Sequence, residues 1–197
     1  MEFASKNLTV GQLNALVKEI GGEEKVLGIL RGELLLTISS NTIAAENPDL
    51  LSVDYSQTFE QMIADGHYDW KNDDITAKRF PLSGKGIEEM EFKEFHFDLD
   101  IESDDAKTRI EQEDRTNPWM PAKIEYLLAF GKKFPDKQRQ YPIVALGSVC
   151  KVRSNRGVAY LVGHDVNRDL DLRRWDDRWG RICRFLAVRK KVSASQP

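Results

Sequence analysis

The chain has 197 residues, of which 41% are apolar and 31% are charged, with 13 glycines and 7 prolines. This composition is typical of a globular protein and excludes the disordered and collagen-like classes. Its 2 cysteines are too few for a disulfide framework or a four-cysteine zinc site.

The net charge of −3 conceals a separation of charge along the chain. Residues 1–116 contain 25 acidic and 12 basic side chains, whereas residues 117–197 contain 7 acidic and 17 basic ones. Such a separation is compatible with a nucleic-acid surface, with an acidic partner, or with two halves that neutralise each other. Composition alone does not choose among these three explanations.

Neither a secretory signal peptide nor a membrane-spanning segment is visible in the sequence. The first ten residues lack the basic and apolar regions of a secretory signal peptide. No stretch approaches the roughly 18 consecutive apolar residues of a membrane-spanning helix. We therefore expect a soluble, cytoplasmic protein that does not enter a membrane, with surface display through a partner as the open alternative.

Residues 1–38 are expected to form a helical hairpin followed by a short strand. Thr9 and Gln12 match a capping box, and apolar residues follow at helical spacing until a Gly-Gly pair. A second helix is predicted from Glu23 to about Gly32, and a strand over residues 34–38. A unit of this size is too small to be stable alone, so it should dock on the rest of the chain or on another subunit.

The middle of the chain is predicted to be a linker with one accessory helix. Residues 39–56 are rich in serine, asparagine and proline, which favour irregular structure. Residues 58–64 have the pattern of a short helix that an Asp-Gly pair ends. We therefore assign residues 39–84 to a linker and accessory helix, and residues 192–197 to a flexible tail.

Residues 85–191 are expected to form an α+β domain of mainly antiparallel strands with flanking helices. The clearest strand lies between residues 86 and 103, where Phe95, Phe97, Leu99 and Ile101 alternate with polar residues. Met90 and Phe92 have the opposite phase, which predicts a bulge near Lys93 and Glu94. The other predicted elements are a helix capped by Ser103 and running to about Glu113, a helix over residues 121–130, and strands over residues 143–146, 158–162 and 184–189.

The sequence contains no recognisable catalytic or cofactor motif. It has no G-x-S-x-G element, no G-x-G-x-x-G element and no Walker-type loop. Its 3 histidines occur in unrelated contexts, without metal-ligand spacing. The run from Asp165 to Asp176 imitates a calcium loop, but Leu170 stands where that loop needs glycine. We expect no enzymatic activity, no cofactor and no bound metal ion.

The segment from Asn167 to Cys183 is the strongest candidate for a binding surface. Arginine and tryptophan are enriched in binding hot spots, and this segment contains both, interleaved with aspartates. Trp179 is expected in the core, whereas exposed and buried positions are equally open for Trp175. The expected ligand-binding residues are Asp169, Asp171, Arg173, Arg174, Trp175, Asp176, Asp177, Arg178, Arg181 and Ile182.

Residues 85–191 resemble a C-type lectin-like domain. The resemblance consists of a helix over residues 121–130, the run YPIVALGS over 141–148, a charged W-x-x-x-W stretch, and RFLAVR over 184–189. It is closest to the formylglycine-generating-enzyme-like subtype in variable proteins of bacterial diversity-generating retroelements. The resemblance implies that residues just before the final strand are diversified to bind ligands. Calcium-dependent sugar binding is not implied, because the E-P-N-type motif is absent.

A diversified surface needs apolar positions that stay fixed beside outward positions that change. Here the predicted fixed positions are Leu170, Leu172, Trp179, Phe185 and Val188. The sequence therefore predicts a non-enzymatic protein that binds a protein ligand through a variable C-terminal surface.

The alternative is a nucleic-acid-binding protein that uses the basic, tryptophan-containing C-terminal half. Twelve basic residues lie between Lys151 and Lys191, a composition that suits phosphate contacts and base stacking. Five aspartates in the same stretch would oppose phosphate. The oligomeric state, and whether Cys150 pairs with Cys183, are not determined by the sequence.

Overall fold

The computed structural model describes residues 17–18, 22–31, 50–164 and 166–191. The chain divides into two compact units, residues 1–46 and residues 47–197. In the first unit, helix α2 (Glu23–Leu30) matches the second predicted helix. Most of the first predicted helix, the whole predicted strand over 34–38 and the tail over 192–197 lie outside the described residues.

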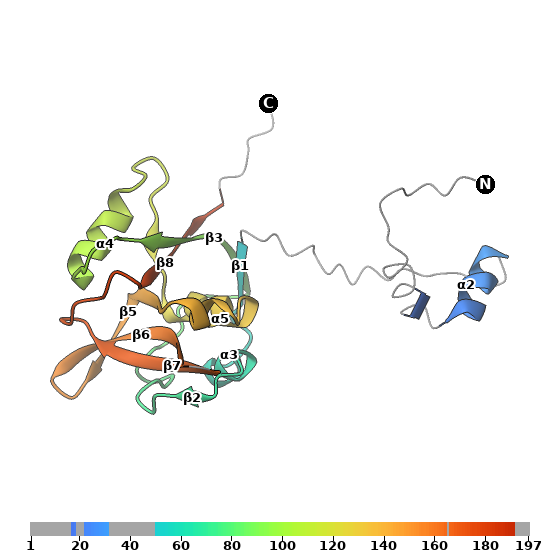
Figure 1. Cartoon of the computed structure of the whole chain (residues 1–197), viewed down its shortest axis with the longest axis horizontal. Helices are drawn as coiled ribbons and strands as arrows, with labels where there is room; N and C mark the ends of the chain where they lie inside the picture. Colours follow the sequence, from blue (N-terminus) through green and yellow to red (C-terminus); the bar gives the residue numbers. More distant parts are fainter. Residues whose placement is uncertain (1–16, 19–21, 32–49, 165, 192–197) are drawn as a thin grey trace. The chain divides into compact units, whose positions relative to one another are not determined.

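The second unit is a mixed α+β structure built on one open sheet (Figure 1). The strands lie in the order β1-β3-β8-β5-β6-β7-β2, and β4 pairs with β8 as well. Most neighbours are antiparallel, but β5 pairs with β8, and β2 with β7, in parallel. The elements are β1 (Leu50–Asp54), α3 (Phe59–Asp65), β2 (Trp70–Lys71), β3 (Ile87–His96), α4 (Ser103–Gln112), β4 (Met120–Pro121), α5 (Ile124–Lys133), α6 (Lys137–Gln140), β5 (Ile143–Val152), β6 (Asn155–His164), β7 (Asn167–Arg174) and β8 (Arg184–Lys190).

The central strands β5 and β8 are buried on both faces. On β5, Ile143 and Ala145 belong to one hydrophobic core, and Val144 and Leu146 belong to a second core on the other face. Residues 185–188 of β8 alternate between the same two cores. A strand that is covered on both sides carries an uninterrupted apolar run. This arrangement accounts for the two continuous apolar runs in the C-terminal part of the sequence.

The acidic and basic parts of the chain are neighbours in this sheet. β3 pairs with β8, and Arg189 forms ion pairs with Glu91 at 2.8 Å and with Asp114 at 3.2 Å. Lys137 pairs with Glu94 at 2.8 Å. Residues 50–191 contain 25 acidic and 25 basic side chains. The two halves therefore neutralise each other within the second unit, the third of the explanations that composition left open.

Residues 50–84 differ from the predicted linker, because they contribute to the sheet and to its core. β1 pairs with β3 along its whole length, and β2 pairs with β7. Leu51 and Val53 are buried in the first core. The accessory helix is present as α3, where Thr58 and Gln61 form a capping box. Pairing with strands distant in sequence creates this burial, and local composition does not reveal it.

The strand predicted over residues 86–103 is β3, which ends at His96 and pairs with β8 without a bulge. Met90 packs into the first core, whereas Phe95 packs into the second. The change of phase that predicted a bulge therefore reflects two buried faces of one regular strand. Beyond β3 the predicted alternation is lost, and Leu99 is exposed.

The helix predicted over residues 121–130 is shifted towards the C-terminus, as α5 (Ile124–Lys133). Pro121 belongs to β4, where it lies opposite Ala187 of β8. Gly131 lies inside the helix and does not end it. A Cβ at this position would lie 2.2 Å from the Tyr68 hydroxyl, so the glycine allows close packing.

A buried arginine joins β7 to two helices. Arg168 is 6% exposed, and its guanidinium donates to the carbonyls of Gly66 and Gly131, each at 2.7 Å. Gly66 is the C-cap of α3, and Gly131 lies in α5. The Arg168 backbone N–H donates to Asp69 at 2.7 Å, and the guanidinium lies 5.3 Å from the centroid of the Tyr68 ring. One side chain thus fixes α3, α5 and β7 to one another.

Replacing Arg168 with leucine is expected to lower the free energy of unfolding by about 3 kcal/mol, because two buried carbonyls lose charged donors. Arg174→Leu is the matched control, since Arg174 is exposed on the same strand and forms no ion pair among the described residues. That control should change stability by no more than about 0.5 kcal/mol. Urea unfolding measures both, and equal effects would contradict the structural role of Arg168.

Gly147→Ala is expected to destabilise the unit by roughly 1–3 kcal/mol, because overpacking must displace backbone. The added Cβ would lie 2.2 Å from the Pro121 carbonyl oxygen, and β4 could not remain in place. Gly180→Ala is the control, since a Cβ there meets nothing within 4 Å. Urea unfolding should give a clearly lower stability for Gly147→Ala than for Gly180→Ala. Equal stabilities would show that β4 can move aside without lowering the free energy of unfolding.

Candidate functional site

Residues 175–183, which we call the β7–β8 loop, connect the last two strands and are held from inside the protein. The backbone of Trp179 exchanges hydrogen bonds with Ile101 at 2.8 and 3.0 Å. The Ser103 hydroxyl donates to the Trp175 carbonyl at 2.7 Å and accepts from Trp179 Nε1 at 2.8 Å. These two hydrogen bonds make Ser103 an anchor of the loop. Ser103 is the first residue of α4 and not its N-cap, so the predicted cap is not formed.

Trp175 is buried, which corrects its assignment to the ligand-binding surface. It is 5% exposed, and its Nε1 donates to Asp104 at 3.1 Å. The guanidinium of Arg156 lies 5.1 Å from the centroid of its ring. The neighbours Arg174 and Asp176 are exposed, so local sequence did not reveal that α4 covers the indole. The predicted core position of Trp179 is confirmed, at 0% exposure.

The candidate residues Asp169, Asp171 and Arg173 share one face of β7, whereas Arg174 lies on the other face. Asp171 is half-buried and accepts from Tyr160 at 3.1 Å and from Asn72 at 2.8 Å. Burial, aided by Asp171, raises the pKa of Tyr160 to about 12, so its hydroxyl remains a donor. Asp169 is half-buried and lies opposite Trp70 of β2, a half-exposed aromatic that the sequence analysis did not select.

Five charged candidate residues at the end of β7 and the start of the loop are exposed or half-buried, and some of them form ion pairs. Arg173 lies 3.6 Å from Asp177, and its guanidinium is 5.3 Å from the centroid of the Trp179 ring. Asp176 pairs with Arg156 of β6 at 2.6 Å. The remaining exposed candidates here are Arg174, which has no ion pair among the described residues, and Arg178, whose guanidinium donates to the Asp100 carbonyl at 3.4 Å.

The last two candidates, Arg181 and Ile182, lie beside a hollow of about 270 Å³, which we call the Ile182 recess. Asp100 holds the loop here by accepting from the Arg181 backbone N–H at 3.1 Å. The Arg181 side chain is exposed and makes no hydrogen bond or ion pair within the part of the chain that the structure describes. Ile182 is 64% exposed. The residues that line the recess are His96, Asp98, Gln140, Tyr141, Arg181, Ile182 and Arg184.

The recess combines cationic, aromatic and aliphatic surface. The guanidinium of Arg184 lies 4.6 Å from the centroid of the Tyr141 ring, so it is positioned by stacking. His96 Nε2 is 2.9 Å from the Arg181 carbonyl oxygen, which indicates that this nitrogen carries the proton. Two guanidinium groups beside one exposed isoleucine can bind a carboxylate next to an aliphatic side chain.

His96, Tyr141 and Arg184 were not selected by the sequence analysis, although they complete the recess. His96 ends β3, Arg184 begins β8, and Tyr141 precedes β5. The pairing of β8 with both β3 and β5 brings these three ends together. No local motif in the sequence signals this meeting of strand ends.

The described residues hold no group of three or more His, Cys, Asp or Glu side chains that could bind a metal ion. Cys150 and Cys183 are unpaired and buried, in the first and second cores respectively. Burial raises the pKa of both thiols. At neutral pH they are therefore protonated, and neither is an activated nucleophile.

Comparison of the chain with protein-family models, curated proteins and solved structures finds no match. None of the helices within the described ranges is long and apolar enough to span a membrane. The function therefore has to be inferred from the geometry of the unit itself.

Ser103→Ala is expected to destabilise the protein by about 2–4 kcal/mol, because the buried Trp175 carbonyl and Trp179 indole N–H both lose their partner. Thr108→Ala on the same helix is the control, since its hydroxyl bonds to a carbonyl at the exposed surface. Urea unfolding measures both effects. A Ser103 variant as stable as the Thr108 variant would show that the loop is held by other contacts.

Proposed function

We propose that this chain is a non-enzymatic binding protein that presents the β7–β8 loop and the Ile182 recess to a polypeptide ligand. The observation that carries the proposal is that buried contacts hold the β7–β8 loop in place while its outer side chains remain exposed. Ser103, Ile101 and Asp100 hold the loop, while the Arg181 and Ile182 side chains are exposed, and that of Arg181 makes no hydrogen bond or ion pair with any described residue. A loop that is ordered before binding loses little entropy on association, which favours specific recognition.

The proposed ligand segment carries an acidic side chain next to an aliphatic one. Arg181 and Arg184 supply two cations at the recess, against the single carboxylate of Asp98. Ile182 and Tyr141 supply apolar contact surface. Arginine and tyrosine are common anchors of protein interfaces, because they combine large contact areas with directional hydrogen bonds.

We also propose that the unit is a C-type lectin-like scaffold of the diversified kind. The positions that such a scaffold must keep fixed support this proposal, since Leu170, Trp179, Phe185 and Val188 are buried and Leu172 is half-buried against the first core. The outward positions at the end of β7 and in the loop are exposed and can change without loss of core packing. Arg174, Asp176, Arg178, Arg181 and Ile182 satisfy this condition. Asp169, Asp171 and Trp175 are constrained by burial or by internal hydrogen bonds.

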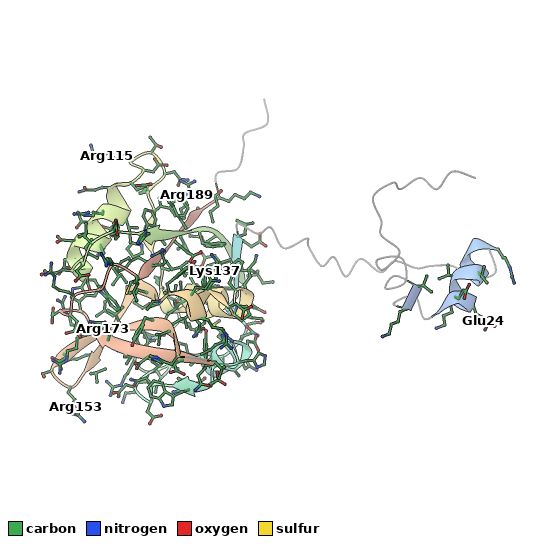
Figure 2. All side chains as sticks on the ribbon, in the orientation of Figure 1. Glu24, Arg115, Lys137, Arg153, Arg173 and Arg189 are labelled. Atoms are coloured by element: carbon green, nitrogen blue, oxygen red, sulfur yellow. The ribbon has the colours of Figure 1, made fainter. Side chains whose placement is uncertain are left out.

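One observation favours the alternative function, binding of nucleic acid. In the β5–β6 hairpin Lys151 lies directly opposite Arg156, and Arg153 at the turn has a φ of +53°, which is unusual for a residue with a side chain. Figure 2 shows Arg153 at the outer end of this hairpin. Against this alternative, Arg156 pairs with Asp176, Arg173 with Asp177, and Arg189 with Glu91, so these three arginines are not free for phosphate.

The proposal is tested with peptides selected from a random peptide library against the full chain. Peptides that combine an acidic and an aliphatic residue should be enriched, and Ile182→Ser and Arg181→Gln should each weaken their binding at least about tenfold. Val166→Ser and Arg115→Gln are matched controls, because they remove an exposed aliphatic and an exposed arginine elsewhere. Fluorescence polarisation with labelled peptides measures the dissociation constants.

Equal weakening by the control variants, or no weakening by the loop variants, would contradict the assignment of the site. Titration with single- and double-stranded DNA at low and high salt tests the alternative. Tight binding with a steep salt dependence would favour nucleic acid and overturn the polypeptide proposal.

The diversified scaffold has its own test in the encoding DNA. A near-copy of the codons for residues 150–189 that differs mainly at adenines, next to a reverse-transcriptase gene, is the expected finding. Absence of such a copy would remove the diversification proposal and leave the binding proposal unchanged.

A further inference from the structure

A second cavity lies away from the β7–β8 loop, between the start of α5 and the end of β8. Its volume is about 340 Å³, which is within the range of small-molecule sites. It is lined from one side by β3 and from the others by the 83–85 segment, β4, α5 and β8. None of the candidate residues described above belongs to it. We call this cavity the lysine pocket.

One wall of the lysine pocket is a closed hydrogen-bond network. Glu88 Oε2 accepts from the Tyr126 hydroxyl at 2.7 Å and from the Tyr55 hydroxyl at 3.2 Å. Tyr55 also lies 3.3 Å from the buried carboxylate of Glu125. Burial is the main cause that raises the pKa of both tyrosines, so they remain neutral donors. This wall satisfies its own polar groups and leaves no hydroxyl proton for a ligand.

The positive charges of the pocket are not satisfied in the same way. Lys85, Lys123 and Lys190 line it from three separate segments of the chain, and the Lys123 ammonium donates to the Ser83 hydroxyl at 2.7 Å. Among the described residues none of the three forms an ion pair with a carboxylate within 4.0 Å, and Glu88 is the only acidic residue of the lining. Helix α5 begins at Ile124 beside them, and the N-terminus of a helix adds partial positive charge.

The rest of the pocket is apolar. Met90 and Val188 lie at its base and are 2% exposed. Ile87 and Met120, which are 72% and 45% exposed, belong to its open side. Two large apolar side chains that remain exposed beside unpaired cations match a ligand with an anionic head and an apolar body.

We propose that the lysine pocket binds an organic anion, with a carboxylate or phosphate group at Lys85, Lys123 and Lys190 and an apolar chain or ring along Ile87 and Met120. The proposal is independent of the polypeptide ligand, because the two sites share no residue. An anion there balances the excess positive charge of the lining, and its apolar part covers surface that is otherwise in water.

The test uses octanoate and octyl phosphate as probes, with octylamine and acetate as the opposite-charge and headgroup-only comparisons. Isothermal titration calorimetry on the full chain should show binding of at least one octyl anion, at least about tenfold tighter than octylamine or acetate. Binding of octanoate alone would identify a carboxylate ligand, and binding of octyl phosphate alone would identify a phosphate ester. Comparable binding of octylamine would overturn the proposal, as would the absence of binding by both anions.

The double variant Lys85→Gln/Lys190→Gln should weaken the anion at least about fivefold. Lys78→Gln/Lys191→Gln is the matched control, because it removes the same charge from exposed positions outside the pocket. The methyl NMR signals of Ile87 and Met120 should shift during the titration, whereas that of Ile182 should not. Equal weakening by both double variants would show that the effect comes from the net charge of the protein, and it would contradict the proposed site.

Discussion

A buried guanidinium holds the second unit together. Arg168 has no carboxylate within ion-pair distance among the described residues, yet it is almost fully buried. Transfer of a charge out of water is costly unless strong hydrogen bonds replace hydration. Here the carbonyls of Gly66 and Gly131 accept the two charged donors. Gly66 caps the C-terminus of α3, where the partial negative charge of the helix end favours a cation.

Both proposed sites are connected with this interaction through the elements that it joins. Arg168 lies on β7, whose C-terminal end leads into the β7–β8 loop. Its guanidinium is also bound to α5, and the opposite end of that helix borders the lysine pocket through Lys123 and Tyr126. Correct docking of α5 and β7 therefore positions the polypeptide surface and the anion pocket together, although the two surfaces differ in chemistry.

Several basic residues of the C-terminal half are buried or form ion pairs, so a count of charges is a weak guide to function. The basic C-terminal half suggested a phosphate-binding surface. In the fold, Arg168 is buried, and Arg156, Arg173 and Arg189 pair with acidic side chains. The cations at the Ile182 recess and in the lysine pocket differ in two respects: they form no ion pair with any described residue, and apolar surface lies beside them. A basic side chain is a candidate for ligand binding only if it does not already form an ion pair within the protein.

The sequence by itself determined the elements whose signals are local. The helix predicted over residues 58–64 is present as α3, and the strands predicted over residues 143–146 and 184–189 are present as parts of β5 and β8. Tertiary structure alone decided that residues 50–54 form a strand, that Trp175 is covered by α4, and that His96, Tyr141 and Arg184 meet at one recess. Periodicity and capping depend on neighbours a few residues away, whereas burial and the meeting of side chains depend on which distant strands pair.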